Sequence, residues 1–188
     1  QDVTRYGEDL YGKNALVPLL KALSMVDGIE WIRLLYLYPE RIDDALIDEI
    51  ANNEKIVKYM DIPLQHCNEN VLKRMNRHGD RESLTALLNK IRGKVEGITI
   101  RTTFIAGFPG ETEEDFNKTI ELVKEVGYAG AFTFIYSPRE GTPAAKMVDN
   151  VPMSVKKERL QRLNAVVNEF SAQKMLEHKG KIVDVLVE

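Results

Sequence analysis

The chain has 188 residues, of which 44% are hydrophobic and 29% are charged, and its net charge is −3 at pH 7. This composition is typical of a globular protein with one domain, or one domain and part of another. The mild negative charge gives no overall sign of nucleic-acid binding, and no apolar run is long enough to span a membrane. A single cysteine, Cys67, excludes an intrachain disulfide and cannot hold a metal cluster.

The order of elements along the chain predicts helices and strands in alternation. Leucines at helical spacing, glycines after apolar runs and acidic or hydroxyl residues before them mark the boundaries. The expected elements are a loop over 1–13, a helix over 14–26, a strand over 29–38, a helix from Asp43 or Asp44 to about 51, a strand over 56–64, helices over 70–75 and 81–95, a strand over 97–108, a helix over 112–126, a strand over 130–136, a loop over 137–152, a helix over 154–179 and a strand over 181–187.

One stretch, TTFIAGFPGE at residues 102–111, reads as a buried strand that runs into a glycine-rich turn. Glycine permits both the tight turn and a close approach of the backbone to a ligand. A helix is expected to begin at Thr112, with Asp115 completing a capping box, and the free N–H groups there favour negative charge. The residues therefore predict either a ligand-binding turn or an ordinary connection between a strand and a helix.

The alternation of strands and helices implies a parallel sheet with helical crossovers. The strands are apolar with weak alternation, so we expect them to be buried on both faces. A doubly wound sheet and an open or closed (β/α) barrel both fit, and both bind ligands at the C-terminal ends of their strands. The residues expected at those ends are Tyr36–Tyr38, Gln65–His66, Gly107–Glu111 and Tyr136–Ser137.

Six segments of the chain match a known family in collinear order and cover nearly its whole length. They are QDVTRYGEDLYG, WIRLLYLYPERI, MDIPLQH, VLKRMNR, RTTFIAGFPGETEEDF and FIYSPREGTPAA. Together they resemble the methylthiotransferases of the radical S-adenosylmethionine (SAM) superfamily. Three stretches resemble the RimO branch, which modifies an aspartate of a small-subunit ribosomal protein, whereas others lean toward the MiaB branch, which modifies an adenosine of tRNA. We favour the RimO branch.

The resemblance implies a three-part enzyme of which this chain is an internal fragment. Residues 1–145 would form about four of the six strands of an open parallel (β/α) radical SAM barrel. Residues 146–180 would form a linker and a long helix, and residues 181–188 would begin a TRAM-like β-domain that binds the substrate macromolecule. The cysteines that ligate the two 4Fe-4S clusters of the family would lie outside this chain, so we expect the chain alone to be inactive.

The resemblance also implies that S-adenosylmethionine is the cofactor and assigns residues to it. Ile105, Gly107 and Phe108 match the motif that holds the adenine through backbone contacts. Gln65 is expected to reach the ribose. Arg101 is expected to meet the methionine carboxylate, although a structural ion pair is an alternative because a charge in a buried strand needs a partner.

Several neighbouring residues complete the predicted site. Tyr136 is expected beside the adenine, while Asp2, Ser137 and Arg139 are expected to face the substrate. Glu111 is expected to anchor the N-terminus of the following helix rather than to contact a ligand. No catalytic residue and no metal ligand is assigned.

Cys67, His66 and the basic start of the long helix are given no part in catalysis. Cys67 is expected to be a small packed thiol. His66 is expected either to face the site or to cap a loop, without a part in proton transfer. The basic residues are expected to form a solvated face, with a surface for RNA or a ribosomal protein as the alternative. They are Lys156, Lys157, Arg159 and Arg162.

The predicted partner is a small-subunit ribosomal protein or the ribosome, with tRNA as the alternative. We expect a cytoplasmic monomer without a membrane partner. Two other kinds of protein also fit the residues. One is a different (β/α)-barrel enzyme that binds a phosphate-bearing substrate at the turn formed by Gly107–Gly110, and the other is a non-catalytic module that binds RNA through the basic helix.

Overall fold

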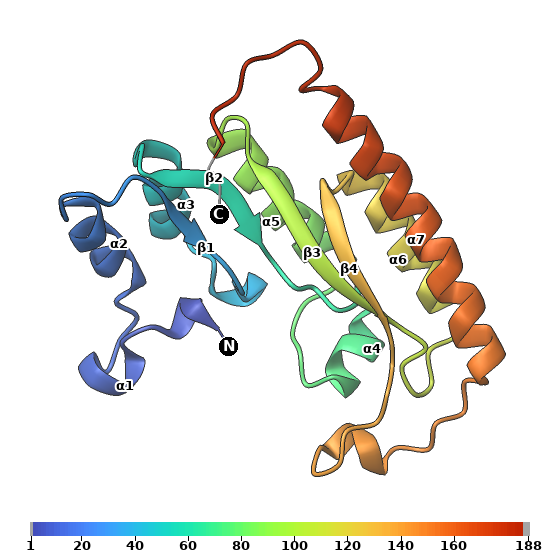
Figure 1. The fold of residues 1–188 in the computed structure, drawn as a ribbon. Helices are drawn as coiled ribbons and strands as arrows, with labels where there is room; N and C mark the ends of the chain where they lie inside the picture. The colour runs from blue at the N-terminus through green and yellow to red at the C-terminus, as the bar shows by residue number, and fades with distance from the viewer. Residues whose placement is uncertain (1, 186–188) are drawn as a thin grey trace.

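A computed structural model describes residues 2–185 as a four-stranded parallel sheet with helices packed on one of its faces (Figure 1). The strands are β1 (Ile32–Leu34), β2 (Ile56–Asp61), β3 (Thr99–Ala106) and β4 (Gly130–Ile135). The α-helices are α1 (Glu8–Tyr11), α2 (Leu16–Ser24), α3 (Asp44–Asn52), α4 (Glu69–Arg74), α5 (Arg81–Lys94), α6 (Glu113–Val126) and α7 (Met153–Leu176). Short 3-10 helices are η1 (Val3–Arg5), η2 (Pro39–Arg41) and η3 (Pro143–Lys146).

The strands lie in the order β1-β2-β3-β4, and each is parallel to its neighbours. A doubly wound sheet reverses this order at a switch point, and the described sheet contains no such reversal. Each helical crossover therefore returns the chain to the next strand position, as in a (β/α) barrel. The prediction of part of an open parallel barrel is confirmed, and the doubly wound alternative is wrong.

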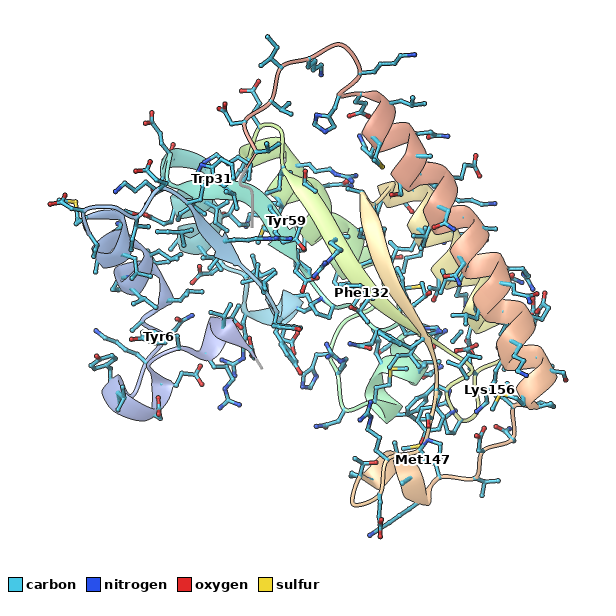
Figure 2. The ribbon with its side chains drawn as sticks, in the orientation of Figure 1. Tyr6, Trp31, Tyr59, Phe132, Met147 and Lys156 are labelled. Carbon is cyan, nitrogen blue, oxygen red and sulfur yellow. The ribbon has the colours of Figure 1, made fainter. Side chains whose placement is uncertain are left out.

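Only one face of the sheet is covered by helices in the part of the chain that the structure describes. Alternate side chains of β3 are buried, whereas those between them stay half-buried. On β4, Phe132 and Phe134 are 51% and 54% exposed. The expectation that the strands are buried on both faces is therefore wrong. We call the uncovered side, which carries Tyr59, Arg101 and these two phenylalanines, the open face (Figure 2).

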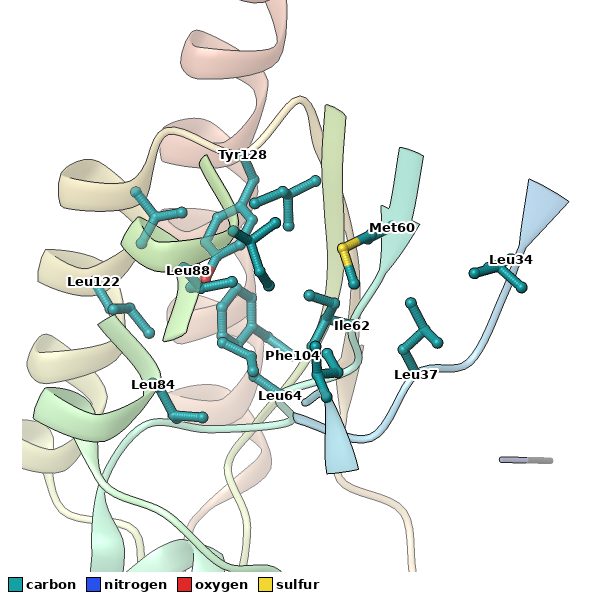
Figure 3. Close-up of a cluster of buried hydrophobic side chains, with 14 of the residues drawn as sticks. Leu34, Leu37, Met60, Ile62, Leu64, Leu84, Leu88, Phe104, Leu122 and Tyr128 are labelled. Atoms are coloured by element: carbon teal, nitrogen blue, oxygen red, sulfur yellow. The ribbon is translucent and has the colours of Figure 1, made fainter. Parts of the chain in front are cut away.

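The hydrophobic core fills the space between the sheet and the helices (Figure 3). Phe104 of β3 lies at its centre and meets Tyr128 edge-on, with ring centroids 5.9 Å apart. Leu88 of α5 and Leu122 of α6 pack from the helix side. The helix α7 packs against β4 and α6, so it belongs to the same helix layer.

Local sequence signals set most element boundaries as predicted. Asp43 accepts a hydrogen bond from the N–H of Leu46 and caps α3. Thr112 and Asp115 bond each other's backbone N–H groups at the start of α6, which is a capping box. Gly127 ends that helix with a φ of 58°, a conformation that glycine adopts without strain.

Several predicted elements differ from the observed ones. The loop expected over 1–13 contains η1 and the short helix α1. The strand expected over 29–38 is only three residues long, because Tyr36 adopts a φ of 61° and the chain leaves the extended conformation. Helix α7 has Pro152 rather than Ser154 at its N-cap. Residues 181–185 are exposed and form no strand, and residues 186–188 lie outside the described residues. The TRAM-like domain and the division of the chain at 145 and 180 therefore stay predictions.

No helix among residues 2–185 is both long enough and apolar enough to cross a membrane.

Candidate functional site at the C-terminal ends of the strands

Two non-glycine residues with positive φ lie where β1 and β2 end. Tyr36 has a φ of 61° and Gln65 a φ of 71°; such conformations are unusual and cluster at functional sites. Gln65 is fixed beside β3, because its N–H donates to Thr103 O at 2.8 Å and its carbonyl accepts from Ile105 N at 2.9 Å. Its side-chain amide makes no hydrogen bond within residues 2–185. The amide is thus free for a ligand, in keeping with the predicted role.

The turn after β3 has no room for a side chain at its first glycine. Gly107 has a φ of 75°, and a Cβ built there would overlap Cγ of Lys156. The second glycine, Gly110, has a φ of 77°, and the movable guanidinium end of Arg74 lies where its Cβ would be. Side chains from α4 and α7 therefore enclose this turn, which we call the Gly107 turn (residues 107–110). Lys156 lies at the start of α7, beside the end of the sheet (Figure 2).

The N–H groups of both glycines are used by the chain itself. Gly107 N donates to the two carboxylate oxygens of Glu111 at 3.1 and 3.0 Å. Gly110 N donates to Oδ1 of Asn150 at 2.7 Å. A phosphate bound at a glycine-rich turn needs such N–H groups to point at it, and here it would also meet the negative charge of Glu111. These bonds contradict the alternative in which a phosphate-bearing substrate binds at this turn.

Glu111 is the most enclosed charged group of the site, with its side chain 0% exposed. Besides Gly107 N it accepts from Nη1 of Arg159 at 2.8 Å and lies 3.5 Å from Nε2 of His66. The expectation that Glu111 anchors the following helix is wrong, because Thr112 performs that role. The carboxylate instead folds back and fixes the turn that precedes it.

The basic start of α7 is largely neutralised by acidic partners. Lys156 and Arg159 are only 1% and 4% exposed, so the expectation of a solvated face is wrong for both. Lys156 Nζ pairs with Asp149 at 2.6 Å. Arg162 pairs with Glu113 at 2.6 Å.

Within residues 2–185, Lys157 is the one member of the predicted basic group without an ion pair. A nucleic-acid surface needs several cations that are free to neutralise phosphates. The alternative of an RNA-binding module that uses this helix start is therefore contradicted. Lys156 and Arg159 are buried. The alternative that they form a surface for a ribosomal protein is therefore contradicted as well.

Arg101 lies on the open face and forms an ion pair that crosses from β3 to β2. Its Nε donates to Oδ1 of Asp61 at 3.2 Å, and its guanidinium carbon lies 4.4 Å from the ring centroid of Phe132. The structural ion pair that the sequence left as an alternative is thus present. Both Nη groups of Arg101 lack a hydrogen-bond partner among residues 2–185. One edge of the guanidinium therefore stays available to an anion.

Sequence reasoning missed Asp61, which is 2% exposed. Its second oxygen accepts from the N–H of Tyr36 at 3.4 Å, so one carboxylate connects β1, β2 and Arg101. The signal that could have found it is an acid at the end of an apolar run, just before Ile62 and Pro63. Such a buried acid requires a cationic partner.

Phe108 and Tyr136 pack against each other beneath the Gly107 turn. Their ring centroids are 4.9 Å apart at 70°, and both residues are buried. The hydroxyl of Tyr136 donates to Ala144 O at 2.9 Å, and burial raises the pKa of this phenol. The two rings hold the 137–152 connection to the turn. Contact of Tyr136 with an adenine stays a prediction.

The three predicted substrate-facing residues lie at the strand ends. The side chain of Asp2 accepts from Thr4 N at 3.0 Å and caps η1. The next residue bonds the carbonyl of Tyr36, which places Asp2 beside the end of β1. Ser137 and Arg139 are exposed in the connection after β4. Their roles toward a substrate stay predictions.

The described residues do not fit a metal cluster. No group of three His, Cys, Asp or Glu side chains within residues 2–185 could hold a metal ion. Cys67 is buried, and its Sγ lies 3.5 Å from Oγ1 of Thr119. Burial raises the pKa of this thiol to about 11, whereas a cluster needs thiolates. Cys67 is a packed thiol, as predicted.

Comparison with known proteins places the chain among enzymes of one superfamily. The sequence pattern of the Radical SAM superfamily matches residues 6–123. A Clostridium novyi protein named ribosomal protein uS12 methylthiotransferase RimO is 46% identical over 188 residues, which are 100% of this chain and 42% of that protein. A tRNA-2-methylthio-N(6)-dimethylallyladenosine synthase from Anoxybacillus flavithermus is 50% identical over an alignment of 189 positions, which covers 100% of this chain and 36% of that protein. The chain thus spans less than half the length of these relatives.

Solved structures share the fold at lower identity. Coproporphyrinogen III oxidase HemN from Escherichia coli, described as a radical SAM enzyme, aligns with a TM-score of 0.64 and 24% identity over 81% of this chain and 36% of that one. The radical SAM methyltransferase TsrM from Kitasatospora setae aligns with a TM-score of 0.56 and 16% identity over 69% of this chain and 26% of that one. These likenesses concern the fold alone.

Proposed function

Since the chain belongs to the Radical SAM superfamily, we propose that it is the SAM-binding part of a methylthiotransferase of the RimO kind. The full-length enzyme would add a methylthio group to an aspartate of a small-subunit ribosomal protein. Identity of 46% to a RimO protein along all of this chain supports the proposal. So do the segments TRYGEDLYG, RLLYLYP and DIPLQH, which resemble that branch.

One observation carries the SAM assignment most directly. A glycine turn with no room for a side chain lies at the end of β3, and Gln65 with its free amide lies beside residues 103–105 of the same strand. The half-paired guanidinium of Arg101 lies further back along β3. The adenine would contact the backbone of Ile105 and Gly107 through atoms other than their N–H groups, which already bond Gln65 and Glu111. Gln65 would bond the ribose, and Arg101 would bond the methionine carboxylate. A charge-assisted hydrogen bond of this kind contributes about 1.5–3 kcal/mol.

When it is bound, SAM supplies the radical chemistry that defines the superfamily. The residues of this chain would bind and orient the cofactor. Phe132 and Tyr59 flank the guanidinium of Arg101, and their rings would keep water from one side of the ion pair, which strengthens the pairing. We propose that the ligands of the family's 4Fe-4S clusters lie outside residues 2–185, because Cys67 is unsuited to that task.

The alternative substrate is an adenosine of tRNA, as in the MiaB branch. The 50% identity to a tRNA-modifying synthase supports it, and the same SAM site would serve both substrates. We further propose a cytoplasmic, monomeric enzyme whose TRAM-like domain begins near residue 181. Its partner would be the ribosomal protein or the ribosome, or tRNA under the alternative.

The substrate is tested by mass spectrometry with the full-length, anaerobically reconstituted enzyme. SAM, a sulfide source and a reductant are supplied together with either ribosomal protein uS12 or unmodified tRNA. The proposal predicts a methylthio group on an aspartate of uS12 and none on tRNA. Modification of tRNA alone would establish the alternative, and modification of neither would contradict both.

A further inference from the structure

Two side chains of α7 reach the Gly107 turn although they lie much later in the sequence. Arg159 and Glu111 are 48 residues apart in the sequence, yet Nη1 of Arg159 donates both to the carboxylate of Glu111 at 2.8 Å and to its backbone carbonyl at 3.1 Å. The same carboxylate accepts the N–H of Gly107 through both oxygens. We infer that Arg159 is a positioning residue, which holds the Gly107 turn in its SAM-binding shape through Glu111.

The contacts that run from Arg159 through Glu111 to Gly107 are buried, and this is why they can fix the backbone at Gly107. The side chain of Arg159 is 5% exposed and that of Glu111 is 0% exposed. Inside the protein the hydrogen bonds compete little with water. Glu111 therefore keeps one orientation, with its oxygens aimed at Gly107 N, only while the guanidinium remains beside it.

A second residue of α7 acts on the other side of the same glycine. The stem of Lys156 lies where a Cβ of Gly107 would be, and its Nζ is held by Asp149 and lies 5.0 Å from the ring centroid of Tyr136. Within one helical turn of α7, the stem of Lys156 thus fills the space next to Gly107, and the guanidinium of Arg159 orients Glu111. The start of α7 therefore fixes the position of the Gly107 turn.

The same helix provides a matched control. Arg162 lies one turn further along, pairs with Glu113 and Glu158, and has a side chain that is 40% exposed. Among residues 2–185 it contacts neither Glu111 nor Gly107 through a hydrogen bond or an ion pair, although it shares Glu113 with Arg159. Replacing either arginine by methionine removes one guanidinium and one positive charge from α7, and only the Arg159 change acts on the turn.

The inference rests on the proposed function, because it concerns the turn assigned to SAM. The test uses the full-length, reconstituted protein and two measurements: deuterium uptake of the peptide spanning 104–112, and the Kd of SAM by equilibrium dialysis. The variants are Arg159→Met, Arg162→Met and the double variant Glu111→Gln with Arg159→Met. The double variant carries no unpaired buried charge, so it guards against a simple failure to fold.

We expect amide exchange in the 104–112 peptide to be about tenfold faster in both Arg159 variants than in the wild type. The SAM Kd should rise about tenfold, which corresponds to about 1.4 kcal/mol. Arg162→Met should stay within about twofold of the wild type in both measurements. The faster exchange and the higher SAM Kd should both be seen well below the unfolding temperature of each variant, because they come from the Gly107 turn and not from unfolding of the whole protein.

Two results would overturn the inference while leaving the SAM site in place. One is equal exchange in the double variant and in Arg162→Met, and the other is faster exchange with an unchanged SAM Kd. A third result separates the two proposals. If SAM binds the wild type without slowing exchange in the 104–112 peptide, the turn is not the SAM site, and the proposed function fails together with the inference.

Discussion

Asp61 at the end of β2 and Arg101 near the start of β3 are joined by a 3.2 Å hydrogen bond from Nε of Arg101 to Oδ1 of Asp61. The carboxylate is 2% exposed and the guanidinium 27% exposed. The acid therefore orients a cation whose free edge faces outward from the sheet. This ion pair fixes the position of one positive charge on the open face.

Replacing Arg101 by methionine should weaken SAM binding by the full-length enzyme about tenfold to a hundredfold. The loss is that of one charge-assisted hydrogen bond to a carboxylate, about 1.5–3 kcal/mol. Arg33→Met is the control, because Arg33 also stacks on Tyr59, at 4.2 Å from the ring centroid. Equal SAM affinity in the two variants would show that the Arg101 charge has no role in the site.

Changing Gly107 to alanine should destabilise the protein by about 2–4 kcal/mol, because it adds an unfavourable φ and a clash with Lys156. Gly12→Ala separates the two effects. Gly12 has a φ of 66° with nothing within 4 Å of its missing Cβ, so it should cost only about 1–2 kcal/mol. Urea unfolding measures both values. If the two variants were equally stable, the contact with Lys156 would be of no consequence.

Stability at acidic pH should depend on Asp44. Hydrogen bonds from Lys90 and Lys94 lower the pKa of this carboxyl from 3.8 to about 2. A lowered folded-state pKa stabilises the fold above the ordinary pKa, and this stabilisation is lost as pH falls through the folded-state value.

The difference in unfolding free energy between wild type and Asp44→Asn should therefore be full at about pH 5 and shrink between about pH 4 and pH 2. Because the pair is exposed, about 1 M salt should reduce the difference as well. Chemical denaturation at each pH provides the measurement. A difference that is the same at pH 2 and pH 5 would rule out the proposed ion pairs.

The element order and the position of the site follow from local signals in the sequence. Thr112 with Asp115 specifies the start of α6, and Gly127 specifies its end. The end of each predicted strand carries polar or aromatic residues, and the structure brings those of neighbouring strands to one edge of the sheet. Arg101 could be recognised as a charge that needs a partner.

The contacts between distant segments could not be read from the sequence. Lys156 and Arg159 belong to a run of basic residues that is typical of a solvated helix face, and only the packing of α7 against the sheet shows that both are buried. The direction of Glu111 also depends on Arg159, which is 48 residues away. The early end of β1 reflects the φ of Tyr36, which no local signal specifies.

Cys67 should behave as a buried thiol that binds no iron. Its pKa is raised to about 11 by burial, so a thiol reagent at neutral pH should react at least about a hundredfold faster after unfolding. After anaerobic reconstitution, the 188-residue chain alone should contain far less than one iron per chain and bind SAM weakly. Cys67→Ala should have the same iron content. Stoichiometric iron that disappears in this variant would contradict the assignment.

Cross-linking of SAM tests the central claim most directly. Radiolabelled SAM is bound to the full-length, reconstituted protein, irradiated with ultraviolet light, and the labelled peptides are mapped. The proposed site predicts label in the peptides that contain Gln65 or residues 105–108, and less of this label in the Arg159→Met variant at a SAM concentration near the wild-type Kd. Label confined to the hollow between α4 and α6, which is lined by Asn68, Asn70 and Lys118, would contradict it.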